Sequence, residues 1–139
     1  MKVWKDQFSG DAMASNDFPH RQLYGGACLE LQGSYLKSFS LAGDEAASPR
    51  IDVVERFGLK EVKIEKSTWG TYIKLYLKRI SMQLEQEGSS RDRVESFKES
   101  AAELAKFILS IYSRVTIYQG RSGDALAGYA YSYSQEVDG

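Results

Sequence analysis

Residues 68–87 read TWGTYIKLYLKRISMQLEQE, and the spacing of the apolar side chains in this stretch is the strongest structural signal in the sequence. They recur at steps of three and four, so at about 100° per residue they fall within an arc of roughly 140°. This pattern predicts an amphipathic helix about 30 Å long, with Ser67 as its N-cap and Gly88 as its stop. Its apolar stripe consists of Trp69, Tyr72, Ile73, Tyr76, Leu77, Ile80 and Leu84.

A second amphipathic helix is expected soon after Gly88. Asp92 and Glu95 have the spacing of a capping box. Because the connection is short, the two helices must be antiparallel neighbours, and we predict a helical hairpin over residues 67–112. The apolar stripe of the second helix consists of Val94, Phe97, Ala101, Leu104, Ala105, Ile108 and Tyr112.

The segments on either side of the hairpin have the composition and alternation of short strands. Residues 9–19 (SGDAMASNDFP) are expected to form turns, Gly33 and Ser34 to join two strands in a hairpin, and residues 40–50 to form a mobile loop. Tyr129, Tyr131 and Tyr133 should share one strand face. The predicted strands are Lys2–Phe8, Ala27–Gln32, Tyr35–Phe39, Ile51–Phe57, Leu59–Ile64, Val115–Tyr118 and Ala125–Ser134.

The order of strands, helical hairpin and strands predicts an α+β fold in a single domain, residues 1–139. Its parts are strands over 1–66, the helical hairpin over 67–112 and C-terminal strands over 113–139. A length of 139 residues with 42% hydrophobic and 27% charged residues is ordinary for one globular domain. The net charge of −1 argues against attraction of the whole protein to nucleic acid or to an acidic membrane.

The cellular localisation predicted from the sequence is the cytosol. No stretch approaches the roughly 20 apolar residues that span a bilayer, and Lys5 and Asp6 interrupt any apolar signal at the start. The single cysteine, Cys28, cannot form an internal disulfide, which fits a reducing compartment.

Catalytic chemistry has little support in the sequence, and we expect no catalytic residue. His20 is the only histidine and stands in a polar segment, which favours a surface position. Two Cys and His residues are too few for a structural zinc site, and no phosphate-binding glycine motif is present. Cys28 lies within a predicted strand, so a buried, inert thiol is favoured over a nucleophile.

Charge patterning on the first helix is more informative. Lys74 and Lys78 are four residues apart opposite the apolar stripe, and Arg79 lies at its margin. The strip is either a solvated face or a local binding site for an acidic partner. Leu75 and Met82 lie off the main stripe, where they either broaden the buried face or accompany the basic strip as a contact patch.

The second helix carries an acidic ridge of Glu95, Glu99 and Glu103. A straight ridge cannot wrap a calcium ion in the six to eight oxygens it prefers, so a solvated face is the favoured interpretation. Weak divalent binding is left open at the ridge or near Asp124, Glu136 and Asp138.

Several segments in chain order resemble the translationally controlled tumour protein family. WKDQFSGDAMASND resembles its opening strand and D-x-x-S-x-D-E-M element, and ACLELQG its next strand. IDVVERFGLKEVKI with STWGTYIKLYLKRISMQLEQ resembles its central strands and first long helix. RDRVESFKESAAELAKFILSIYSRVTIYQG resembles its second helix and following strand.

The resemblance implies a twisted, mainly antiparallel β-sheet framework with a projecting helical hairpin. It implies a non-enzymatic cytosolic protein of growth and stress survival, with protein partners such as tubulin and microtubules, and no cofactor beyond weakly bound calcium. In that family tubulin binding is attributed to the hairpin, which makes Lys74, Lys78 and Arg79 the candidate residues here.

Two alternatives follow from the same resemblance. One is a nucleotide-free chaperone or exchange factor for a small Rab-like GTPase, contacted through Asp11 and Glu45. The other, more remote, is a methionine-R-sulfoxide reductase-like enzyme that would use Cys28. The sequence departs from the family pattern in a shortened acidic loop, in a shortened C-terminus, at Ala12 and at Arg121, where the family has acidic residues. These departures weaken the GTPase alternative.

Overall fold

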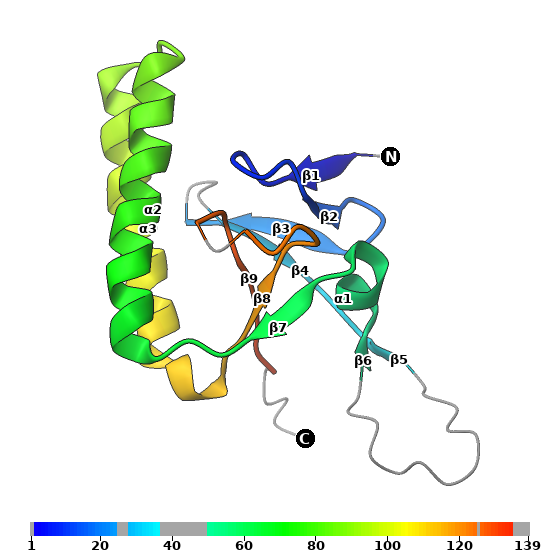
Figure 1. The fold of residues 1–139 in the computed structure, drawn as a ribbon. Helices are drawn as coiled ribbons and strands as arrows, with labels where there is room; N and C mark the ends of the chain where they lie inside the picture. Colours follow the sequence, from blue (N-terminus) through cyan, green and yellow to red (C-terminus); the bar gives the residue numbers. More distant parts are fainter. Residues whose placement is uncertain (1, 25–27, 37–49, 125, 135–139) are drawn as a thin grey trace, which may run out of the picture.

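In the computed structural model, residues 2–24, 28–36, 50–124 and 126–134 are described. Two long antiparallel helices stand along one side of a group of short strands, and their connecting turn projects beyond the strands (Figure 1). The helices are α2 (Lys66–Gln86) and α3 (Arg91–Ser110). All observed strand pairs are antiparallel. The predicted α+β class and the helical hairpin are therefore confirmed.

Within the described residues, the strands form four small sheets. The first three pair β1 (Val3–Lys5) with β2 (Ala12–Ser15), β3 (His20–Leu23) with β4 (Cys28–Leu31), and β5 (Tyr35–Leu36) with β6 (Arg50–Ile51). The fourth, in the order β7-β8-β9, consists of Lys60–Val62, Thr116–Gln119 and Ala130–Ser132. A short 3₁₀ helix, Tyr112–Arg114, leads from α3 into β8. The order along the chain thus places β7 and β8, neighbours in the sheet, at the two ends of the helical hairpin.

The helices pack on tyrosine side chains of β9 and of the residues that flank it on either side. The ring of Tyr129 lies 4.6 Å from that of Tyr72 on α2, and Tyr133 meets Phe107 on α3 at 5.6 Å. Between them, Tyr131 meets Trp69, which is fully buried. The prediction that Tyr129, Tyr131 and Tyr133 share one face is confirmed, and this face joins the hairpin to the sheet.

One predicted strand is wrong: Ile51–Phe57 contains the helix α1 (Asp52–Phe57). The Asp52 carboxylate accepts hydrogen bonds from the backbone N–H groups of Val53 and Ser34, which ties down the start of the helix. Gly58 ends it in the left-handed conformation, with φ of 62°, where glycine carries no steric penalty. Two adjacent valines are compatible with a strand or with a short helix. The contacts of Asp52 at the start and the left-handed Gly58 at the end therefore favour the helix.

Two further strand assignments are wrong. The predicted turn region 9–19 contains β2, whose residues Ala14 and Ser15 are buried. Strand β4 pairs with β3 rather than with the segment after Gly33, and a hydrogen bond from Gln32 N–H to the Pro19 carbonyl continues that pairing. Residues 37–39 of the predicted second strand, and 40–49 of the predicted mobile loop, lie outside the described residues.

The helix caps also differ from the prediction. Helix α2 begins at Lys66 after Glu65, so Ser67 is not its cap. Helix α3 begins one residue before Asp92, and its cap is Ser90, whose hydroxyl accepts from the Arg93 N–H. Gly88 does follow the end of α2, with φ of 82°. These shifts move the helix ends by a residue or two and leave the hairpin intact.

A candidate protein-binding surface on the helical hairpin

The base of the hairpin is fixed by aromatic side chains. Trp69 is buried against Ile108 of α3 and Ile117 of β8, and its indole N–H donates to the Tyr131 hydroxyl at 3.0 Å. The Tyr72 hydroxyl donates to the Ala127 carbonyl. A buried Trp or Tyr whose polar atom has a partner is held in one orientation. The opposite face of α2 is therefore presented to solvent in a defined direction.

Lys74 and Lys78 lie on that exposed face of α2. Neither ammonium group forms an ion pair with any residue that the structure describes. Unpaired, solvated lysines keep their full charge available to a partner, although salt weakens the attraction. Two exposed lysines four residues apart on one helix face are the geometry that a basic binding strip requires.

Two large apolar side chains share this face. Leu75 is 61% exposed and Met82 49%, so neither broadens the buried stripe. We call Lys74, Leu75, Lys78, Arg79 and Met82 the hairpin face, since on a helical projection they span an arc of roughly 140°. Exposed apolar groups among basic ones are a composition seen at protein interfaces.

Arg79 differs from the two lysines. Its guanidinium lies 3.8 Å from the centre of the Phe8 ring and donates a hydrogen bond to the Leu126 carbonyl. These contacts link α2 to the β1–β2 turn and to the loop after β8. Arg79 is still exposed, but it serves partly as a structural tie, which its position in the sequence could not indicate.

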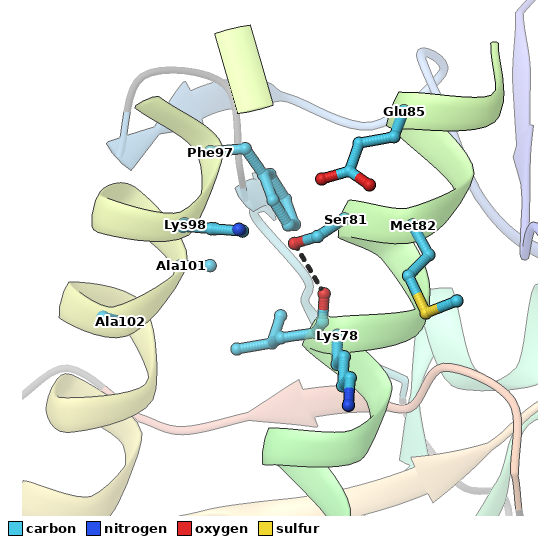
Figure 2. A pocket seen from close by; sticks show the side chains of 9 residues that line it. Lys78, Ser81, Met82, Glu85, Phe97, Lys98, Ala101 and Ala102 are labelled. Carbon is cyan, nitrogen blue, oxygen red and sulfur yellow. Dashed lines mark hydrogen bonds between the residues drawn. The ribbon is translucent and has the colours of Figure 1, made fainter. Parts of the chain in front are cut away.

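A groove runs between the two helices near their connecting turn (Figure 2). Its volume is about 400 Å³, within the range of roughly 300–1,000 Å³ typical of ligand pockets. The sequence offered one signal that was missed: Ser81 and Ala101 are small residues at inner positions of the two helices. The groove is lined by Leu77, Lys78, Ser81, Met82, Glu85, Phe97, Lys98, Ala101 and Ala102.

Asp11, predicted as a partner contact, binds a loop of its own chain. Its carboxylate accepts from both the hydroxyl and the backbone N–H of Ser122. The Ser122 hydroxyl is the main cause that holds the pKa of Asp11 below its usual range, and the Arg121 charge acts in the same direction. Asp11 thus ties the β1–β2 turn to the loop after β8. Its contact with a GTPase stays a prediction. Glu45, the other predicted contact, lies outside the described residues.

The profile of the translationally controlled tumour protein family matches residues 1–138. The chain belongs to this family. A family homologue from Plasmodium berghei is 30% identical over 151 residues, covering 96% of this chain and 87% of that protein. A homologue from Theileria parva is 27% identical over 153 residues, with the same coverage of both chains.

Solved structures of family members have the same fold. The protein from Schizosaccharomyces pombe superposes with a TM-score of 0.78 at 23% identity, covering 96% of this chain and 88% of that one. The protein from Caenorhabditis elegans gives 0.69 at 19% identity, covering 98% and 87%. The fold expected from the resemblance is therefore confirmed by its similarity to two solved structures of family members.

Two of the departures from the family pattern, at Ala12 and Arg121, have structural explanations. Ala12 packs at the edge of the core cluster around Phe57 and Tyr118, so an apolar residue suits its surroundings. Arg121 lies across Gly58, where a built Cβ would come within 2.9 Å of the guanidinium. The charge at 121 therefore faces the end of α1.

Residues with catalytic or metal-binding potential are scattered. The thiol of Cys28 has a pKa raised by burial and, secondarily, by Glu30, which disfavours the reactive thiolate. His20 is exposed, as predicted, with its ring edge against Trp4. Within the described residues, no three His, Cys, Asp or Glu side chains gather as a metal site requires. None of the described helices is long and apolar enough to cross a membrane.

Proposed function

We propose that this member of the translationally controlled tumour protein family is a non-enzymatic cytosolic interaction protein whose hairpin face binds acidic protein segments. The acidic tails of tubulin in microtubules are the partner we favour. The observation that carries the proposal is that Lys74 and Lys78 are exposed, without ion-pair partners among the described residues, beside the exposed Leu75 and Met82. A role in growth and stress survival would follow from such binding.

The physical basis is long-range attraction completed by short-range contact. The net charge of the chain is −1, so the attraction has to come from this local patch and should be strongly screened above physiological salt. Exposed apolar side chains then add contact area that salt does not weaken. Binding curves measured at several salt concentrations should therefore separate the electrostatic contribution, which salt weakens, from the apolar contribution, which it does not.

Cosedimentation with microtubules tests the proposal. We expect Lys74→Glu with Lys78→Glu to reduce affinity at least about ten-fold, equivalent to ~1.4 kcal/mol. The matched control is Lys60→Glu with Lys63→Glu, which makes the same charge change at exposed positions of β7 and the segment after it. Circular dichroism should show both variants folded. Equal binding of the two double variants would reject the assignment to the hairpin face.

Calcium binding is a separate part of the proposal, and it rests on family membership alone. Loosely organised sites bind calcium at about 10⁻⁴–10⁻³ M. Titration calorimetry at millimolar calcium should therefore give a measurable heat if the property is present in this chain. A flat titration would remove calcium from the proposed function without affecting the binding of acidic segments.

A further inference from the structure

The groove between α2 and α3 exists because small residues meet where the hairpin leaves the sheet. Ser81 and Ala101 are 5% and 2% exposed, and both line the groove, where their short side chains leave space between the helices. Nearer the base, Trp69 is buried against Ile108 of α3. The Ser81 hydroxyl donates to the Leu77 carbonyl of its own helix at 3.0 Å. Because that polar group is already satisfied, the floor of the groove suits an apolar occupant.

Charges around the groove select the occupant further. Lys78 on α2 and Lys98 on α3 line it from opposite sides, while Glu85 lines it closer to the connecting turn (Figure 2). Lys98 approaches Glu95 at only 3.9 Å, and both side chains are at least half exposed. Such surface pairs contribute little, so the ammonium group of Lys98 can turn to another carboxylate. One lysine of each helix therefore lines the groove, while Glu95, Glu99 and Glu103 of the acidic ridge on α3 are not among the lining residues.

We propose that this groove receives the apolar side chains of an acidic protein segment, whose carboxylates lie beside Lys78 and Lys98. The proposal rests on the function proposed above and adds that recognition needs an apolar anchor as well as negative charge. The groove volume of about 400 Å³ accommodates leucine-sized side chains. Glu85 repels acidic residues at the turn end, so the acidic part of the segment lies toward Lys78.

Peptide binding followed by fluorescence anisotropy tests this. The probe is a labelled peptide of about 15 residues, glutamate and alanine with two leucines one helical turn apart. The reference peptide has both leucines replaced by alanine. In the protein, Ala102→Trp fills the groove from its exposed rim without changing charge. Ser96→Trp is the matched control, because Ser96 is exposed on α3 and does not line the groove.

We expect Ala102→Trp to lower the affinity for the leucine peptide about ten-fold or more. This is the loss expected when one apolar side chain is excluded from the groove. Ser96→Trp should bind it as the unmodified protein does. The alanine peptide should bind weakly to all three proteins, and Glu85→Gln should tighten binding of both peptides. Lys78→Glu should weaken both.

Three results would overturn the groove proposal. If Ala102→Trp binds the leucine peptide normally while Lys78→Glu does not, the hairpin binds by charge alone and only the function proposed above stands. If Lys78→Glu also binds normally, that function fails too. If sedimentation shows a dimer of the free protein that Ala102→Trp dissociates, the occupant is a second copy of this chain.

Discussion

Gly128 lies where the loop after β8, the β1–β2 turn and helix α2 come together. Its backbone N–H donates to the Asp6 carboxylate at 2.9 Å. A Cβ built on Gly128 would come within 2.6 Å of both the Asp6 carboxylate and the Tyr76 hydroxyl. We predict that Gly128→Ala separates these groups and loosens the attachment of the hairpin.

The expected loss follows from two effects. Overpacking a close contact costs about 1–3 kcal/mol, and a weakened hydrogen bond to a charged acceptor costs about as much, but relaxation makes the two overlap. We expect the free energy of unfolding to fall by about 2 kcal/mol in total. For a chain of this size that lowers the melting temperature by roughly 8 °C.

Urea unfolding followed by circular dichroism measures the change, with Gly70→Ala as the matched control. Gly70 lies within α2, and nothing lies within 4 Å of the Cβ that the change would add. Alanine there should raise the free energy of unfolding by about 1 kcal/mol, because glycine is a poor helix former. A Gly128→Ala variant as stable as the unmodified protein, or a shift of stability in the same direction by both substitutions, would contradict the prediction.

Three further predictions concern titratable groups. Burial, assisted by Asp6, raises the pKa of Tyr76 to about 12. The stability this tyrosine contributes is thus complete below its unfolded pKa of about 10 and lost as pH rises from there to about 12. Tyr76→Phe should make the fall in stability over that range less steep, although Tyr72 and Tyr131, whose pKa values burial also raises, still contribute to it. An unchanged slope would contradict the assignment. For Asp11, NMR titration of the carboxyl carbon should give a pKa below the ordinary value, and Ser122→Ala should raise it; no response to the serine would be evidence against the observed contact. Because burial raises the pKa of the Cys28 thiol, a thiol reagent at pH 8 should label the folded protein more slowly than the unfolded one, and equally fast labelling would revive the reductase alternative.

The helical hairpin was predictable because its signal is long and redundant. The apolar stripes of α2 and α3 each repeat over about five turns, so no single exception obscures them. Strand β2 has four residues, of which Ala12, Ala14 and Ser15 are small, and a period of two cannot be established over so short a stretch. Its pairing with β1 depends on contacts across the intervening turn, which local pattern does not contain.

The candidate site was predictable only in part. The spacing of Lys74 and Lys78 correctly places both on the exposed side of α2, because that follows from helix geometry alone. The contacts of Arg79 could not be predicted, since Phe8 and Leu126 are distant in sequence and meet it only in the folded chain. The groove depends on which small residues of two helices face each other, so it required the register between them.

The most direct test of acidic-segment binding by the helical hairpin is a map of where such a segment binds. Backbone amide shifts of the ¹⁵N-labelled protein, recorded during titration with a peptide of the acidic tubulin tail, would provide it. We expect the largest shifts over residues 74–85 of α2 and 97–102 of α3, and we expect them to decrease as salt is added. Shifts confined to the sheets around β1–β4, with these two helix segments unchanged, would contradict it.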